Sequence, residues 1–257
     1  MSPSVRVHVA SYNTAAATEL CVRSARRLAG MPFALTVGDG GSADGSLPML
    51  RRFAERGALD LEVAEGGRAH AAWLDLWYAT CTERFCVFSD SDVEYLAEGW
   101  LADMVQTAER TGAALVATRI QARDGVAYRH PTTGAERTLA RRPEPWLLLL
   151  DLAQTRPRVA TSFKYVDRPG ADGTKIAYDT AAAFFEDVDR AGLAWTEMPA
   201  SYAAAYHHFG SLSWLGGRDV PLRRRAKQLA KRAYVRARLV RARLLDARNG
   251  QGSRNRR

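Results

Sequence analysis

Residues 84–92 read Arg-Phe-Cys-Val-Phe-Ser-Asp-Ser-Asp, and this stretch places two acidic residues directly after a short apolar run. A run of this length, rich in β-branched and aromatic side chains, is typical of a buried strand. Ligands of open α/β sheets collect at the carboxyl ends of the strands, so Asp90 and Asp92 can face a bound ion or sugar. Carboxylate oxygens favour Mg²⁺ or Mn²⁺, whose coordination is often completed by phosphate. A solvated acidic turn is the alternative, since most acidic residues are exposed.

Strand-like and helix-like patterns alternate along the first 120 residues. Strands are predicted for residues 5–10, 33–37, 59–63 and 85–89, and helices for residues 15–28, 47–55, 69–80 and 100–110. Two further strands are expected at residues 113–118 and 146–150, and the polar stretch between them suits an exposed loop or hairpin. This alternation predicts an α/β fold with a mostly parallel, doubly wound sheet flanked by helices.

The charge of the chain is unevenly distributed. Residues 221–257 hold 14 of the 37 lysines and arginines and one of the 28 acidic residues, so residues 1–220 carry a net charge of −4 although the whole chain carries +9. Residues 1–220 are long enough to form one domain with a buried core. We expect residues 221–257 to form a basic amphipathic helix that becomes disordered from Gly250 onward. Apolar residues recur there at spacings of three and four: Leu222, Ala226, Leu229, Ala233, Ala237, Val240 and Leu244.

This basic C-terminal segment leaves three interpretations open. It can bind an anionic membrane surface, where each Lys or Arg contributes about 1 kcal/mol, pack against the acidic domain, or stay solvated. Clustered arginines also bind the phosphates of nucleic acid. Tyr234 is the only aromatic residue among them, however, so nucleic acid is not the expected partner.

The apolar runs and the cysteines bear on where the protein works. No apolar run approaches the roughly 18 residues of a membrane span, and the first residues lack a basic region followed by an apolar stretch. Cys21, Cys81 and Cys86 show no metal-type spacing to a histidine, so we expect reduced thiols in the core. These features predict a cytoplasmic protein, peripheral at the inner face of the membrane if the basic segment binds lipid.

Two turns after predicted strands suit a nucleotide. Ser11, Tyr12 and Asn13 end the first strand, and Gly-Asp-Gly-Gly-Ser-Ala-Asp-Gly-Ser (residues 38–46) ends the second. The glycines allow positive φ and close approach of a ligand to the backbone. Asp39 can accept hydrogen bonds from a base or a ribose. A tight turn whose own Asp or Ser caps the next helix is the structural alternative.

Residues 38–43 also match a relaxed dinucleotide fingerprint, with Glu62 or Glu65 as the ribose acceptor. An NAD site would leave Asp90, Asp92 and the later histidines without a role. The turn also follows the second predicted strand rather than the first, where the fingerprint belongs.

Adjacent histidines lie near the end of the predicted domain. His207 and His208 precede Phe-Gly-Ser-Leu-Ser-Trp, a segment of small and aromatic residues. This pairing favours a ligand or metal site over two surface histidines. His8 and His70 are expected to be structural, and His130, in the polar stretch, suits the surface equally well.

Taken in order, these motifs resemble the inverting family 2 glycosyltransferases of GT-A fold, over residues 4–216. The matching segments are Val-Ala-Ser-Tyr-Asn (9–13), Val-Gly-Asp-Gly-Gly-Ser-Ala-Asp-Gly-Ser (37–46), Phe-Ser-Asp-Ser-Asp-Val-Glu (88–94) and His-Phe-Gly-Ser-Leu-Ser-Trp (208–214). Each segment alone is modest, but four in the expected order and spacing are specific.

The resemblance implies a role for each matching residue. Asp39 contacts the nucleotide base, Asp90 the ribose or sugar, and Asp92 a divalent Mn²⁺ or Mg²⁺ that bridges the diphosphate. His208 is the expected second metal ligand, in preference to His207, because its spacing to the following Gly and Ser fits the family motif better. The donor-binding residues implied in this way are Ser11, Tyr12, Asn13, Asp39, Arg68, Asp90, Ser91 and Asp92.

The resemblance also implies a base that deprotonates the acceptor. The family carries Glu-Asp near a late glycine, and Glu186 and Asp187 lie within six residues of Gly192, inside a predicted helix over residues 180–190. Asp179 lies 13 residues before Gly192, near the family distance. We therefore expect Asp179 to be the base, with a pure helix N-cap as the alternative and Gly192 as the C-terminal cap.

The implied function is a metal-dependent, hexosyltransferase-like glycosyltransferase that moves a sugar from a nucleotide-diphosphate donor to an unknown acceptor hydroxyl, with inversion. A sugar nucleotidylyltransferase shares the sheet but requires an early Gly-rich loop with a basic residue, which is not found after Val9. A nucleic-acid- or membrane-binding module driven by the C-terminal segment is the non-enzymatic alternative. It gives no role to Asp39, Asp90 or His208.

Overall fold

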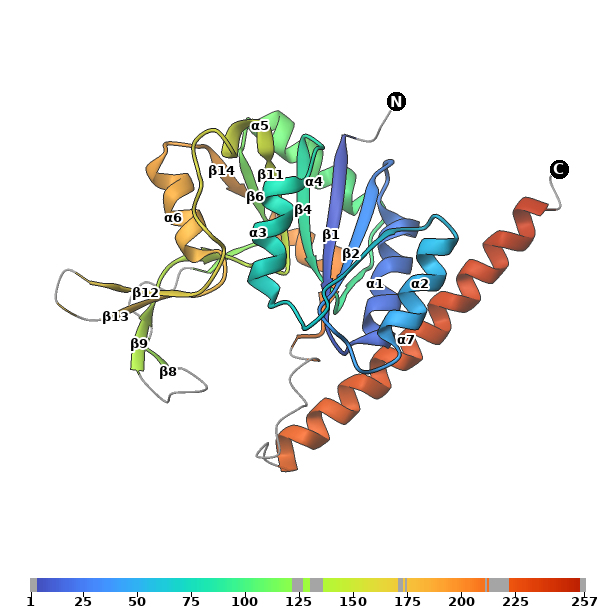
Figure 1. Cartoon of the computed structure of the whole chain (residues 1–257). Coiled ribbons are helices and arrows are strands. Elements are labelled where there is room, and N and C mark those ends of the chain that lie inside the picture. The colour runs from blue at the N-terminus through green and yellow to red at the C-terminus, as the bar shows by residue number, and fades with distance from the viewer. Residues whose placement is uncertain are drawn as a thin grey trace.

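A seven-stranded, mostly parallel sheet lies at the centre of the computed structural model, which describes residues 4–121, 127–129, 136–170, 173, 175–210, 212 and 222–254. The strand order is β14-β6-β11-β4-β1-β2-β3 (Figure 1). The strands are β1 (Val5–Ser11), β2 (Ala34–Asp39), β3 (Asp60–Val63), β4 (Phe85–Asp90), β6 (Leu115–Ala117), β11 (Leu147–Asp151) and β14 (Trp195–Glu197). Only β11 runs antiparallel to its neighbours β4 and β6. The predicted α/β fold is confirmed.

Helices cover both faces of this sheet because its central strands are apolar on both sides. Val5, Val7 and Val9 of β1 face one side, whereas Cys86 and Phe88 of β4 face the other. The first side packs against α1 (Ala15–Leu28), α2 (Ser46–Glu55) and α4 (Trp100–Thr111). The second packs against α3 (His70–Thr80), α5 (Leu152–Thr155) and α6 (Ala182–Arg190).

Strand register brings the polar turns together. Ser11 of β1 pairs with Asp39 of β2, and Ala10 pairs with Asp90 of β4. The carboxyl ends of these three parallel strands therefore lie at one edge of the sheet.

A short antiparallel pair brings the late histidines to the same edge. β5 (Val93–Tyr95) pairs with β15 (Tyr206–His208), which follows a 3₁₀ helix, η1 (Ala200–Ala205), and His208 lies opposite Val93. The amide of Phe209 also donates to the carbonyl of Asp92, at 2.9 Å. His208 is thus fixed beside the acidic residues that follow β4.

The polar stretch before β11 contains short strands. β8 (Ala127–Arg129) and β9 (Glu136–Leu139) form the predicted hairpin, and β13 (Lys175–Tyr178) and β12 (Val166–Pro169) extend it to a four-stranded sheet. β7 (Ile120–Gln121) pairs with β10 (Arg142–Pro143) beside it. His130 lies outside the described residues.

The predicted N-cap of α6 is wrong. The helix begins at Ala182 rather than at residue 180, because the chain turns at Ala181, whose φ is 71°. The Asp179 carboxylate instead accepts a hydrogen bond from the amide of Thr180, at 2.8 Å. Gly192 follows the helix with φ 65°, as expected for a C-terminal cap.

The basic segment forms one helix, α7 (Leu222–Arg254), which packs along α1 (Figure 1). The expectation of disorder from Gly250 is wrong up to Arg254, where the helix ends, and residues 255–257 lie outside the described residues. Val235, Leu239 and Ala242 are buried against α1. No described helix is both long and apolar enough to cross a membrane.

Ion pairs fix α7 to the acidic domain. Arg238 binds Glu94 through three hydrogen bonds of 2.8–3.1 Å, and Arg243 binds Glu19 at 2.8 Å. Asp246 contacts Arg23 at 2.6 Å. These pairs select the helix face that packs inward, and the stripe predicted from apolar spacing faces solvent instead: Leu229, Val240 and Leu244 are 63%, 55% and 60% exposed.

Candidate active site

A pocket of about 330 Å³ opens at the carboxyl ends of β1 and β4. Most of the predicted donor-binding residues and His208 line it, together with residues that were not predicted. The lining residues are Ala10, Ser11, Tyr12, Thr14, Arg68, His70, Trp73, Asp90, Ser91, Asp92, Thr180 and His208.

The pocket lining contains a compact group of three side chains, Asp90, Asp92 and His208. Their ligand atoms lie within 4.8 Å of one another. His208 Nε2 lies 3.2 Å from Asp92 Oδ1 and 3.5 Å from Asp90 Oδ2. Trp146 stacks on the His208 ring, with ring centroids 4.6 Å apart, and holds its orientation. His207 points away and contacts Phe209, so it is not part of the group.

The charges of this group are interdependent. Burial alone would lower the pKa of His208, but hydrogen bonds to Asp90 and Asp92 raise that pKa to about 9. Burial would raise the pKa of Asp90, but the charge of His70 and the hydrogen bonds from His208 and His70 hold it below its usual value. At neutral pH a protonated His208 therefore lies beside the ionised Asp90.

His70, expected to be structural, belongs to this site. Its Nε2 lies 3.0 Å from Asp90 Oδ1, at the first residue of α3. Burial lowers the pKa of His70, but the charge of Asp90 outweighs it, so the pKa is raised. The only sequence feature that could have predicted this role is the position of His70 shortly after Gly67-Arg68, at the start of a predicted helix. A single histidine at such a position does not form a recognisable motif.

Asp39 is fully buried at the end of β2, and only one of its oxygens is occupied. Oδ1 accepts the amides of Gly41 and Ser42 at 3.1 and 2.8 Å. Oδ2 is buried, and no hydrogen-bond partner lies near it among the described residues. An unpaired buried carboxylate oxygen is costly. Asp39 is not among the residues that line the pocket.

The two predicted serines of the site, Ser11 and Ser91, lie within hydrogen-bonding distance of threonines at the start of α1. Ser11 Oγ lies 3.0 Å from Thr18 Oγ1, and Ser91 Oγ lies 2.9 Å from Thr14 Oγ1. Both serines line the pocket but already have protein partners. This network joins the ends of β1 and β4 to the start of α1.

Asn13, Arg68 and Tyr12 are the remaining donor-site residues, and Asn13 holds the turn after β1 against the turn after β2. Asn13, at φ 54°, accepts the amide of Ala43 at 2.8 Å and links the first turn to the second. Arg68 lies over the Trp73 ring, 4.5 Å from its centroid. Tyr12 is half exposed at the rim of the pocket.

Asp179 lies beside the pocket rather than in its lining. Its Oδ2 pairs with Arg142 at 3.0 Å, and its neighbour Thr180 lines the pocket. Glu186 contacts Tyr178 and Asp187 contacts Arg190, and neither of these two residues of α6 lines the pocket. Of the late motif, residues 211, 213 and 214 lie outside the described residues.

Solved structures with a similar fold include two glycosyl-transferring enzymes. Mannosyltransferase PcManGT from Pyrobaculum calidifontis, in complex with GDP-Man and Mn²⁺, matches with a TM-score of 0.56 and 16% identity over 96% of this chain and 76% of that chain. Glucosyl-3-phosphoglycerate synthase from Mycobacterium tuberculosis, in complex with phosphoglyceric acid, matches with a TM-score of 0.50 and 16% identity over 93% and 79%. At this identity the likeness concerns the fold, which is of the GT-A type.

A sequence profile of glycosyl transferase family 2 matches residues 6–190, which is more than half of the chain. No curated protein sequence matches. The matched range includes the turns after β1 and β2 and the acidic residues after β4. The chain therefore belongs to glycosyl transferase family 2.

Proposed function

We propose that this glycosyltransferase requires a divalent cation and moves a sugar, with inversion, from a nucleotide diphosphate to an acceptor hydroxyl. The observation that carries the proposal is the group of Asp90, Asp92 and His208, which lines a pocket at the carboxyl ends of β1 and β4. The non-enzymatic binding module gives this group no role, and a nucleotidylyltransferase requires an early Gly-rich loop with a basic residue, which is not found after Val9.

The residues of the group fit Mn²⁺ or Mg²⁺. Two carboxylates and one imidazole suit a hard divalent cation, and Mn²⁺ accepts imidazole more readily than Mg²⁺ does. Asp92 and His208 would hold the ion, and it would stabilise the negative charge of the departing diphosphate. The Mn²⁺ bound with GDP-Man in PcManGT, a protein of similar fold, supports this assignment.

Two acidic residues and one arginine would divide the binding of the donor. The unpartnered Oδ2 of Asp39 would accept a hydrogen bond from the base. Asp90, whose Oδ1 is held by His70, would accept a hydroxyl of the ribose or sugar. Arg68, which stacks on Trp73 at the pocket wall, would pair with a phosphate.

Asp179 is proposed as the base. Its ion pair with Arg142 orients the carboxylate beside Thr180, a pocket residue. The acceptor hydroxyl would give its proton to Asp179 as its oxygen bonds to the anomeric carbon. The bond from that carbon to the diphosphate breaks on the opposite face, which inverts the anomeric centre.

A donor screen tests the proposal. GDP-, UDP- and dTDP-sugars are added with and without Mn²⁺ while the melting temperature is measured, and turnover of the stabilising donor is followed by NMR. We expect stabilisation by one nucleotide class only with the ion, and release of the sugar with the anomer opposite to that of the donor. Asp92→Asn and His208→Gln should lose both effects, and His207→Gln should keep them. Equal stabilisation without the ion would contradict metal dependence.

We also propose that the outer stripe of α7, defined as Leu229, Val240 and Leu244, binds anionic lipid. Exposed arginines flank this stripe, among them Arg236 and Arg241. Their chains can extend along an apolar surface while their charges contact lipid phosphate. A second copy of α7 would bring like charges together, so charge complementarity favours a lipid surface.

Sedimentation with lipid vesicles tests this interface. Removing α7 would uncover the apolar face of α1, so point variants are more informative than truncation. The triple change L229S/V240S/L244S should abolish sedimentation with phosphatidylserine vesicles. Val166→Ser, at a residue that is 38% exposed on β12, is the matched control and should sediment like the unchanged protein. Equal sedimentation of the triple variant would refute lipid binding through the stripe.

A further inference from the structure

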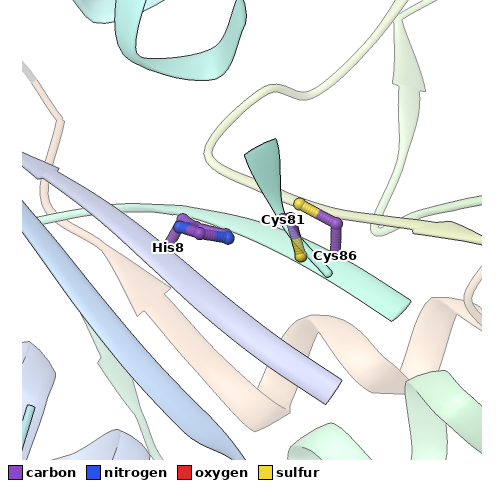
Figure 2. A group of neighbouring side chains, drawn as sticks. All are labelled: His8, Cys81 and Cys86. Atoms are coloured by element: carbon purple, nitrogen blue, oxygen red, sulfur yellow. The ribbon is translucent and has the colours of Figure 1, made fainter. Parts of the chain in front are cut away.

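Three potential soft-metal ligands meet in the core, away from the active site. His8 lies on β1, Cys81 directly after α3, and Cys86 on β4, and their ligand atoms lie within 4.8 Å of one another. Figure 2 shows the imidazole of His8 extending toward the two sulfur atoms. All three residues are at least 97% buried. Their spacing in the sequence gave no sign of this, because 73 residues separate His8 from Cys81.

His8 is the residue that packing alone leaves unexplained. Both of its ring nitrogens are buried, and neither has a hydrogen-bond partner among the described residues. One face of the ring stacks on Trp77, with centroids 4.9 Å apart. Stacking does not satisfy a nitrogen lone pair or an N–H group, and buried polar groups nearly always have partners. A ligand at the edge of the ring would supply the missing one.

The two thiols differ from the third cysteine of the chain. Cys21 is buried on the other face of the sheet, where its thiol lies 3.7 Å from the carbonyl of Asp90. Cys81 and Cys86 share one face, and the Cys81 thiol lies 3.5 Å from Glu83 Oε2. Glu83 itself is held by Arg6 on Oε1 and by the amide and hydroxyl of Thr82 on Oε2, and it is not part of the group of ligand atoms.

We propose that His8, Cys81 and Cys86 bind a thiophilic divalent cation of the Zn²⁺ class. Two thiolates and one neutral imidazole are the donors that Zn²⁺ selects, and their charge neutralises the ion inside an apolar core. Binding replaces the two thiol protons, which are released to water. The site differs in chemistry from Asp90, Asp92 and His208, whose carboxylates suit Mn²⁺ or Mg²⁺.

The site would cross-link three elements of the core. It joins β1, β4 and the end of α3 on the face of the sheet opposite α1. Such a cross-link stabilises the two strands whose ends carry the donor-binding residues. We therefore expect the ion to be structural and to enter during folding, since the ligands are closed to solvent.

Cobalt substitution tests the proposal without reference to activity. The full chain is produced in medium supplemented with Co²⁺, and its absorption and metal content are measured after purification. We expect a thiolate-to-cobalt charge-transfer band, and the same band for Cys21→Ala, which removes a buried thiol outside the site. Cys81→Ala and Cys86→Ala should both lose the band. No band in the unchanged protein, or an undiminished band in both variants, would overturn the proposal.

A second measurement requires no variant, in case the alanine changes prevent folding. X-ray absorption on the unchanged protein loaded with Zn²⁺ during expression should show two sulfur neighbours at about 2.3 Å and a nitrogen at about 2.0 Å. A shell of nitrogen and oxygen alone would place the ion elsewhere and refute the site. Detection of a Cys81–Cys86 disulfide in the purified protein would refute it too.

Discussion

The raised pKa of His208 predicts that Mn²⁺ binding depends steeply on pH. A pKa of about 9 means that the free site holds a proton at pH 7, and that the ion must expel this proton to bind the ring nitrogen. The gap of about two pH units corresponds to about 2.7 kcal/mol, or a hundredfold in the apparent affinity. Because the proton is bound in the free state, affinity rises as the pH rises and levels off above about pH 9.

Calorimetry at several pH values measures this effect. Between pH 7.0 and 8.5, under nitrogen to prevent oxidation of Mn²⁺, the dissociation constant should fall by about thirtyfold, which is about tenfold per pH unit. Titrations at pH 7 in buffers of different ionisation enthalpy should show the release of about one proton per ion.

Two variants separate His208 from the other groups in the site. His208→Gln should bind Mn²⁺ weakly and with a flat pH profile, because the titrating ligand is gone. His207→Gln changes an exposed ring outside the group and should keep the full slope. A dissociation constant independent of pH in the unchanged protein, or a slope that survives in His208→Gln, would refute the proposed role of His208.

Three further changes give distinct results. Asp179→Asn should lower kcat by about 10²–10⁴-fold while the donor affinity measured by calorimetry is retained. Asp187→Asn, the control, should leave kcat and donor affinity unchanged. An active Asp179→Asn enzyme would exclude Asp179 as the base. Asp39→Asn should weaken nucleotide binding by about tenfold without changing Mn²⁺ affinity, because one charge-assisted hydrogen bond is lost. An unchanged nucleotide dissociation constant would argue against contact between Asp39 and the nucleotide base. Gly38→Ala should lower the free energy of unfolding in urea by about 1–3 kcal/mol, because the added Cβ would lie 2.7 Å from Trp77. Gly45→Ala should have little effect, because no atom lies within 4 Å of its added Cβ. Equal stability of the two variants would contradict the packing argument.

The sequence predicted the central sheet because local pattern and final packing agree there. Apolar runs such as residues 85–89 are buried on both faces, so they carry a strong strand signal that tertiary contacts do not override. The grouping of Asp39 with Asp90 was predictable for the same reason, since parallel strands end at one edge of the sheet. The assignment of His208 as a partner of Asp92 came from the family resemblance, because no local sequence pattern links two residues so far apart in the chain.

The failures arise where the outcome depends on distant partners. The sequence left open which face of α7 packs inward, because the spacing of apolar residues contains no information about Glu94 and Glu19, the partners of Arg238 and Arg243. The N-cap at Asp179 failed because Ala181 adopts a positive φ, which is uncommon outside glycine and asparagine. The role of His70 depends on its meeting Asp90 across the pocket.

α7 also supports the active site through its contacts with the histidine segment. Lys231 donates to the carbonyls of Phe209 and Gly210, directly after His208, and Arg238 holds Glu94 on the strand that pairs with β15. A lipid surface that binds the outer stripe therefore acts on the same helix that fixes a proposed metal ligand. Loss of α7 is expected to affect the proposed lipid binding and the proposed metal binding together, so a truncated protein could not distinguish them.

The two acidic residues after β4 have different surroundings, and this argues for different roles. Asp90 is held by His70 on Oδ1 and lies farther from His208, at 3.5 Å, than Asp92 does, at 3.2 Å. If Asp92 and His208 hold an ion as proposed, the ion would take the place of the proton on His208, and Asp90 would keep His70 as its partner. Asp90 would then remain oriented, with its second oxygen available for a hydroxyl of the donor. The different partners of the two carboxylates therefore support assigning Asp92 to the proposed ion and Asp90 to the proposed sugar nucleotide.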